Sequence, residues 1–358
     1  VKNSGGTMRF IHTGDIHLGA TPESKRPWAA NRGDEIWNTL ERLIKKIKID
    51  PVDLLIIAGD MFHRQPLLRE LKEVDYLFST IPDTKVVLCA GNHDAIKKGS
   101  FYDGFKWSEN VIFLGDKNIE SVEIPELNTC VYGLSYHQTE IKDAMYDHVI
   151  VDMINILVAH GGDEKHIPIN RKKLAMSGFD YVAMGHIHKP EIDEKMKMAY
   201  SGSLEPIDMN DIGPRGYIYG EISKRGLELE FVPFAKRIYR ELDFTVTPTA
   251  TNLEIRHRLI DMIKEQGQDD MYKITFSGYR DPDFDIDVSD IEGVGNVVNV
   301  TDNTVPDYDF EELYAENKDN ILGMYIKKFL DRESLTPLQR KTLYYGTKAL
   351  MDAMEDRA

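Results

Sequence analysis

Five short apolar runs, each followed by glycine and by side chains that bind metals, constrain this chain most strongly. The runs are Arg9–Thr13, Leu54–Ala58, Val86–Ala90, Ile156–Ala159 and Tyr181–Met184. The residues that follow them are Gly14-Asp15-Ile16-His17, Gly59-Asp60, Gly91-Asn92-His93-Asp94, His160-Gly161-Gly162 and Gly185-His186-Ile187-His188. Short apolar runs bounded by turn residues are typical of buried strands. The sequence therefore predicts five buried strands that end in polar turns.

Segments with helical spacing lie between the first three runs. Asp34–Ile47 and Leu67–Phe78 each repeat apolar residues every three or four positions, and Pro82 ends the second segment. This alternation of strand and helix indicates parallel strands joined by helical crossovers. Further strands are expected at Val111–Leu114, Cys130–Leu134 and Tyr217–Ile222. We therefore predict an α/β fold with two packed sheets.

The carboxyl ends of parallel strands line one crevice, so the residues after these strands should meet. They comprise two aspartates, one asparagine and four histidines, in addition to His93 and Asp94. Such a mixed ligand set suits Mn²⁺, Fe²⁺ or Zn²⁺ rather than Ca²⁺. A bridging carboxylate could hold two ions about 3.5–4 Å apart, the spacing used in hydrolytic two-metal sites. Each motif alone is compatible with a turn, but together they predict a metal site for an anionic phosphate ester.

The pattern changes after Ile238. A strand, a helix and two more strands are expected at Ile238–Phe244, Leu253–Gln266, Tyr272–Phe276 and Val297–Val300. The last segment, Glu311–Ala358, predicts two helices, the second of which begins with Thr336 as N-cap and Pro337. We predict three domains, namely residues 8–236, an α+β domain at 237–310 and a helical tail at 311–358. Residues 1–7 are interpreted as a vector-derived remnant.

The formal net charge of −16 is concentrated in one segment. Asp281–Asp319 holds thirteen acidic residues and one lysine, a net charge of −12, which leaves about −4 for the rest. A negative total weakens the case for tight nonspecific DNA binding, but it leaves room for a local positive site created by metals. We interpret the acidic run Asp283–Asp290 as the solvated face of a strand, with a calcium loop as the alternative.

Two cysteines, Cys89 and Cys130, lie in apolar strand-like runs without CxxC spacing. They predict buried free thiols in a reducing compartment. No apolar run approaches the roughly 20 residues that a membrane helix needs, and no signal peptide is apparent. We therefore predict a cytoplasmic protein without a membrane partner.

The sequence blocks resemble those of a known family. GDIHLG, Gly59-Asp60, GNHD, His160-Gly161 and GHIH are similar to the five signature blocks of the calcineurin-like metallophosphoesterases. HTGDIHLG, AGDMFH, GHIHKP and YSGSLEP resemble more narrowly the SbcD family of DNA-repair nucleases, over residues 8–236. The resemblance implies a four-layered α/β–β/α sandwich, followed by a small C-terminal α+β capping domain and a helical tail.

The resemblance also implies roles for individual residues. One metal ion would take Asp15, His17 and His188, the other would take Asn92, His160 and His186, and Asp60 would bridge them. His93 would be catalytic, acting on the phosphate or the leaving oxygen. His63 would also belong to the catalytic site, in a supporting role near the phosphate, with a surface histidine after the strand as the alternative. Arg32 is a candidate for substrate binding, with a solvated arginine as the alternative. The expected cofactors are two Mn²⁺ ions, with Fe²⁺ or Zn²⁺ as alternatives.

The activity implied is a two-metal DNA nuclease, an exonuclease and single-strand endonuclease of double-strand-break repair or recombination that uses a metal-activated water. The implied partners are DNA, an SbcC-like coiled-coil ATPase bound by Glu311–Ala358, and a second copy of the chain at Leu67–Phe78 and Gly99–Trp107. The alternatives are that the helices of Glu311–Ala358 pack on the domain and that core packing alone explains the apolar stripe of Leu67–Phe78. One alternative is a phosphodiesterase of small or cyclic nucleotides, because the core motifs are shared across the superfamily. Another is a non-catalytic metal-bound scaffold.

Overall fold

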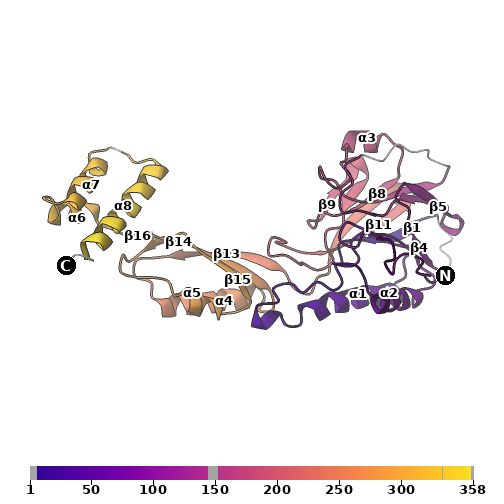
Figure 1. Ribbon diagram of the computed structural model, residues 1–358, viewed down its shortest axis with the longest axis horizontal. Helices are drawn as coiled ribbons and strands as arrows, with labels where there is room; N and C mark the ends of the chain where they lie inside the picture. Colours follow the sequence, from indigo (N-terminus) through magenta and orange to yellow (C-terminus); the bar gives the residue numbers. More distant parts are fainter. Residues whose placement is uncertain (1–5, 144–151, 333, 356–358) are drawn as a thin grey trace. The chain divides into compact units, whose positions relative to one another are not determined.

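A computed structural model describes residues 6–143, 152–332 and 334–355. The chain divides into two compact units, of which the first ends at Tyr239 and the second begins at Arg240 (Figure 1). The division into three domains, with a boundary near residue 310, stays a prediction.

The first sheet of unit 1 has six strands in the order β12-β11-β1-β2-β3-β4. Their bounds are β1 Met8–Thr13, β2 Leu54–Ala58, β3 Lys85–Cys89, β4 Val111–Phe113, β11 Gly216–Ser223 and β12 Gly226–Pro233. Strands β1 to β4 are parallel, whereas β11 pairs antiparallel with both β1 and β12. Helix α1 (Arg32–Ile49) connects β1 to β2, and α2 (Leu68–Ser79) connects β2 to β3, as parallel pairing requires.

The second sheet has the order β5-β6-β7-β8-β10-β9. Its strands are β5 Glu120–Ile124, β6 Thr129–Gly133, β7 Ile154–His160, β8 Tyr181–Gly185, β9 Glu191–Asp193 and β10 Met198–Tyr200. The four inner strands are parallel, and β5 and β9 are antiparallel edges. Helix α3 (Arg171–Ala175) precedes β8, and short 3₁₀ helices lie at Pro27–Ala29, Pro125–Leu127 and Glu194–Met196.

The side chains of each buried strand alternate between two cores, and this arranges the helices and sheets of unit 1 in four layers. In β2, Leu55 and Ile57 pack in the core that contains α1 and α2, whereas Leu54 and Ile56 pack in the core between the sheets. A third core joins the second sheet to Leu174 of α3. Successive strand side chains point to opposite faces, so a strand with no polar break is buried on both. The order helices, sheet, sheet, helix confirms the four-layered sandwich (Figure 1).

Unit 2 contains a four-stranded sheet, one long helix and a helical tail. Its strands are β13 Tyr239–Val246, β14 Met271–Arg280, β15 Val297–Asp302 and β16 Val305–Pro306, and its helices are α4 Asn252–Gln266, α5 Val288–Glu292, α6 Phe310–Glu316, α7 Ile321–Leu330 and α8 Pro337–Glu355. A capping box between Thr251 and Glu254 starts α4. Leu259 and Ile263 of α4 pack in one core with Tyr272 of β14.

The structure corrects two predictions in unit 2. The acidic run Asp283–Asp290 is no strand, because residues 283–287 form an unpaired loop and Val288, Ser289 and Asp290 begin α5. The alternation of acidic and apolar residues in this run reflects burial within the loop, since Ile286 is buried while Asp285 and Asp287 are exposed. Asp287 accepts hydrogen bonds from two backbone N–H groups and thereby caps α5.

The described residues from Phe310 onwards form three helices instead of two. The side chain of Asn320 accepts hydrogen bonds from the N–H groups of Leu322 and Gly323 and begins α7 as a separate helix. The predicted N-cap at Thr336 is confirmed, because its hydroxyl accepts from the N–H of Gln339 at 3.3 Å.

Both cysteines are free and buried, as predicted. Within the described ranges, no helix is both long enough and apolar enough to cross a membrane.

Candidate metal centre

The five predicted turns meet at the carboxyl ends of β1, β2 and β3 in the first sheet and of β7 and β8 in the second. Several of their residues have strained backbones. Eight non-glycine residues in the described ranges have a positive φ, and four of these are Asp15 (48°), His17 (53°), Asp60 (47°) and His186 (86°). Such conformations are uncommon for non-glycine residues and persist where the surrounding structure holds them, frequently at functional sites.

A first cluster contains Asp15, His17 and His188. The Nε2 atoms of the two histidines lie 3.2 Å apart. Oδ1 of Asp15 lies 4.0 Å from Nε2 of His17 and 3.9 Å from Nε2 of His188. Asp15 and His17 are fully buried. These three donor atoms converge as the ligands of one metal ion must.

A second cluster contains Asp60, Asn92, His160 and His186. Nε2 of His160 lies 3.3 Å from Oδ2 of Asp60 and 2.9 Å from Oδ1 of Asn92. Nδ1 of His186 lies 3.2 Å from the same Asn92 oxygen. The structure thus brings together all seven predicted metal ligands in two adjoining clusters.

Asp60 lies between the clusters. Its Oδ1 accepts a hydrogen bond from the backbone N–H of His93 at 2.9 Å, which fixes the carboxylate. Its Oδ2 is 3.3 Å from Nε2 of His160 and 3.8 Å from Nε2 of His17. One oxygen therefore faces a histidine from each cluster, as a bridging ligand requires.

The donor chemistry of the second cluster fits a cation. Nδ1 of His160 lies 2.9 Å from the carbonyl oxygen of Ala58, to which only an N–H can donate. In a neutral ring the lone pair then lies on Nε2 and faces the Asp60 and Asn92 oxygens, which are acceptors too. Three acceptors facing one another repel unless a cation lies among them.

The pKa values of His160 and Asp60 indicate that a proton lies between these acceptors when no metal ion is bound. Burial alone would lower the pKa of His160, but the charge of Asp60 and its hydrogen bond raise it to about 9. Burial opposes the ionised form of Asp60, yet His160 and His17 hold the pKa of that carboxyl well below its usual range. The pair thus holds a proton at neutral pH, and a metal ion would displace that proton.

Two glycines make room for this arrangement. A Cβ on Gly91 would overlap Oδ1 of Asp60, and a Cβ on Gly185 would overlap the carbonyl oxygen of Ala58. Both approaches are far closer than van der Waals contact, so only glycine lets the turns approach the cluster.

His93 and His63 lie at the exposed side of the clusters. Their rings stack with centroids 5.1 Å apart, and the His93 ring meets that of His17 edge-on at 4.9 Å. Nδ1 of His93 lies 3.3 Å from the carbonyl oxygen of His63 and is placed to donate to it. Both histidines are exposed whereas His17 is buried. They can contact a ligand that approaches the buried donors.

Asp94 does not face the clusters. It is fully buried and accepts hydrogen bonds from the N–H groups of Gly91 and Phe62 and from the hydroxyl of Tyr102. Burial raises the pKa of its carboxyl to about 7. Asp94 therefore shapes the turn that presents its two neighbours, Asn92 and His93.

Arg32 lies away from the exposed rim. It is 1% exposed, pairs with Glu35 at 2.6 Å and donates to the carbonyl oxygen of Pro206 at 2.8 Å. Glu205 lies 3.6 Å from the same guanidinium. These contacts are those of a structural residue, so we place Arg32 in the packing of α1 rather than among the groups that meet a substrate.

Two carboxylates near the clusters were not predicted from the sequence. Asp211 lies 3.2 Å from Nδ1 of His188, and Asp163 lies 2.8 Å from Nε2 of His186. Asp211 follows no apolar run, so no local pattern marks it. Asp163 lies four residues after the run Ile156–Ala159, the spacing that His188 has after Met184, and this signal could have found it.

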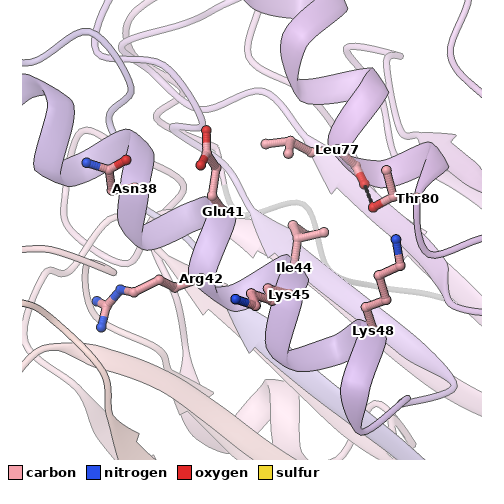
Figure 2. A pocket seen from close by; sticks show the side chains of 8 residues that line it. All are labelled: Asn38, Glu41, Arg42, Ile44, Lys45, Lys48, Leu77 and Thr80. Carbon is pink, nitrogen blue, oxygen red and sulfur yellow. Dashed lines mark hydrogen bonds between the residues drawn. The ribbon is translucent and has the colours of Figure 1, made fainter.

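A groove on the helical layer contains none of the predicted site residues (Figure 2). It is lined by α1 and the end of α2 through Asn38, Glu41, Arg42, Ile44, Lys45, Lys48, Leu77 and Thr80. The metal centre is a separate site at the ends of the strands.

The chain is similar to several known proteins over part of its length. The chain is 25% identical over 253 residues to the uncharacterized metallophosphoesterase YhaO of Bacillus subtilis, covering 63% of this chain and 60% of that protein. It is 26% identical over 259 residues to the DNA double-strand break repair protein Mre11 of Methanopyrus kandleri, covering 63% and 56%. It is 25% identical over 268 residues to a subunit of the nuclease SbcCD from Staphylococcus saprophyticus, covering 63% and 69%.

The chain thus spans less than two thirds of the length of the first two of these relatives. The model of the calcineurin-like phosphoesterase family matches residues 8–190, just over half of the 358 residues and the part that carries all seven clustered donors, from Asp15 to His188. The chain therefore belongs to the calcineurin-like phosphoesterases, a family of metal-dependent phosphoester hydrolases.

Proposed function

We propose that this protein is a two-metal phosphodiesterase that cleaves DNA. The convergence of seven donor atoms in two clusters that share Asp60 carries the proposal, since two-metal sites cleave phosphodiesters. DNA is favoured as substrate because two relatives are named a DNA double-strand break repair protein and a nuclease subunit.

Asp15, His17 and His188 would hold one ion, and Asn92, His160 and His186 the other, with Asp60 bridging them. Two divalent ions held there would polarise the phosphoryl oxygens and supply a nucleophile from water at neutral pH. The ligand set carries two formal negative charges, so two divalent ions and their ligands together are positive and attract a phosphate despite the acidic chain. Mn²⁺ is the proposed ion, with Fe²⁺ or Zn²⁺ as alternatives, since the site mixes imidazole nitrogens with carboxylate and amide oxygens.

His93 would act on the substrate directly. Because its Nδ1 is placed to donate to the carbonyl oxygen of His63, its Nε2 is free to exchange a proton with the leaving oxygen. The stacked ring of His63 limits rotation of His93 and lies where it can contact the phosphate. We assign proton transfer to His93 and a supporting contact to His63.

The second candidate function is hydrolysis of small or cyclic nucleotides, which the same clusters could perform. Metal-free protein is loaded with Mn²⁺ and given labelled single-stranded DNA, labelled duplex DNA or cyclic nucleotides under identical conditions. Cleavage of DNA supports the nuclease, and the products separate exonuclease from endonuclease activity. Activity on cyclic nucleotides alone would refute it, and two bound ions without hydrolysis of any substrate would indicate a scaffold.

Two variants test the assigned roles. His93→Ala should retain two Mn²⁺ ions while turnover falls about 10²–10⁴-fold, because proton transfer contributes that much. Asp60→Ala should lose both ions, since its carboxylate faces both clusters. His257→Ala, on the exposed surface of α4, is the matched control and should change neither quantity. Loss of metal from His93→Ala would show that His93 is a ligand.

A second copy of this chain is a proposed partner at α2 and residues 99–107. Leu67, Leu68 and Tyr76 are 40%, 38% and 70% exposed there, and Phe101 is 50% exposed. Sedimentation of the wild type against Tyr76→Glu tests this interface. A wild type that stays monomeric at micromolar concentration would contradict it.

An SbcC-like coiled-coil ATPase is the proposed partner of the helical tail. Met324, Leu338 and Tyr345 on α7 and α8 are 66%, 75% and 72% exposed, which suits an apolar partner helix. Loss of ATPase binding in Leu338→Glu, with metal content unchanged, would support this.

A cytoplasmic location is proposed because both cysteines are free and buried.

A further inference from the structure

The two histidines of the GHIH motif each contact a carboxylate that lies outside the proposed ligand set. Nδ1 of His188 is 3.2 Å from both carboxylate oxygens of Asp211. Nε2 of His186 is 2.8 Å from Oδ2 of Asp163. The two contacts use opposite ring nitrogens, although the histidines are only two residues apart.

Asp211 is fixed from several sides. It is 6% exposed, and its Oδ2 accepts hydrogen bonds from the N–H groups of Ile207 and Asp208 at 3.0 and 3.2 Å. The guanidinium of Arg215 lies 3.5 Å from its Oδ1. These contacts fix the direction in which the Asp211 carboxylate faces His188.

Asp163 is fixed by its own turn. Its Oδ1 accepts hydrogen bonds from the N–H groups of Lys165 and His166, both at 2.8 Å. Nδ1 of His166 lies 2.9 Å from the same carboxylate. The side chain of Asp163 is 45% exposed, so solvent screens its charge more than that of Asp211, whose side chain is 8% exposed.

A histidine that donates one ring N–H to a carboxylate keeps its lone pair on the other nitrogen. For His188 that nitrogen is Nε2, which faces His17 at 3.2 Å. For His186 it is Nδ1, which faces the oxygen of Asn92 at 3.2 Å. The nitrogen left free is in each case the one that points into a cluster.

We propose that Asp211 and Asp163 are positioning residues that set the tautomers of His188 and His186, each for a different metal ion. The inference rests on the proposed two-metal function. Asp211 would tune the ion held by Asp15 and His17, and Asp163 the ion held by Asn92 and His160. One motif thereby serves two ions whose affinities can be changed separately.

Asp211→Asn and Asp163→Asn test the inference, because asparagine keeps the shape but removes the charge that orients the ring. Loss of an outer-shell partner typically costs about 10–100-fold in metal affinity. The loss of Mn²⁺ affinity should be about 100-fold for Asp211→Asn, because Asp211 is buried. It should be about 10-fold for Asp163→Asn, because Asp163 is half-exposed. Asp208→Asn and Glu164→Gln, which remove exposed charges beside each position, are the matched controls.

Binding of Mn²⁺ to the metal-free protein is measured by calorimetry and by electron paramagnetic resonance. Wild type should bind two ions that couple magnetically. Each variant should bind one ion with unchanged affinity and one weakly, so the signal of a single uncoupled ion appears at intermediate Mn²⁺. The controls should match wild type, and metal-free thermal unfolding shows whether a variant is folded.

Double variants identify which ion each carboxylate serves. Asp211→Asn should cause no further loss of affinity in a His188→Ala background, and Asp163→Asn none in a His186→Ala background, because residues that act through one another are not additive. Equal weakening of both ions by either variant, full additivity, or unchanged affinities in folded variants would overturn the inference. If Asp211→Asn does not fold, the Mn²⁺ affinities of Asp163→Asn, whose substitution is at an exposed position, test the inference. A wild type that binds fewer than two ions would instead refute the proposed function.

Discussion

Glu35 offers a quantitative test of how the first unit is held together. Its Oε2 accepts from Arg32 at 2.6 Å, and its Oε1 accepts from Arg237 at 2.7 Å and from Lys236 at 3.0 Å. The Glu35 side chain is 4% exposed and that of Arg32 is fully buried. Glu35→Gln keeps the size of the side chain and removes the charge that three cations share.

The pKa of Glu35 sets the size of the effect. Burial alone would raise it, but hydrogen bonds from Arg237, Arg32 and Lys236 lower it from 4.5 to about 2. A shift of this size corresponds to about 3 kcal/mol of stability at neutral pH. Removing one partner of a buried ion pair costs a similar amount, about 3–5 kcal/mol. Glu205, 3.6 Å from Arg32, offsets part of the loss, so the lower end is expected.

Thermal unfolding at pH 7 should show a Tm lower by roughly 6–12 °C in Glu35→Gln, for a unit of this size. Because the folded-state pKa is depressed, the contribution is complete above about pH 4.5 and is lost as the pH falls towards 2. The difference between variant and wild type should therefore shrink over that interval. Glu41→Gln, on the exposed face of α1 in the groove of Figure 2, is the control and should shift the Tm by less than about 2 °C.

A Tm difference below about 2 °C at pH 7 would refute this account, since it would mean that the pairing does not stabilise the unit. A large difference that persists unchanged at pH 2 would also refute it. In that case the loss would come from packing and not from charge.

Three further substitutions probe the turn that carries Asn92 and His93. Gly91→Ala should abolish Mn²⁺ binding at both positions, because its Cβ would overlap Oδ1 of Asp60; metal analysis that still finds two ions would contradict this. Asp94→Asn should cost about 2–3 kcal/mol in urea unfolding, because one buried N–H loses its acceptor; an unchanged midpoint would argue against that role. Tyr102→Phe removes one hydrogen bond to Asp94 and should cost about 1 kcal/mol, measured in the same way.

Much of the fold follows from local pattern. The run Leu54–Ala58 is buried along its whole length and forms β2 with the predicted bounds. Helix α1 contains the predicted Asp34–Ile47 and ends two residues later. Both signals are periodicities over a few residues, set by where side chains point along a strand or helix, so a single chain reveals them.

The failures occur where a pattern has more than one physical cause. The alternating acids near Asp285 have the period of a strand, but no neighbouring strand pairs with them, and the loop keeps only the alternation of burial. Arg32 gave no sign of its burial, because two of its three partners, Glu205 and Pro206, are more than 170 residues away in sequence. Charge alone does not tell a surface group from a buried pair.

The sequence by itself determined the buried strands, the glycines at their ends and the types of the candidate ligands, because each depends on residues adjacent in the chain. The tertiary structure decided which nitrogen of His186 and His188 faces the clusters, through Asp163 and Asp211, which come from separate loops. The direction of a ring depends on the partner behind it. That partner is fixed only when the chain has folded and distant loops have come within hydrogen-bond distance.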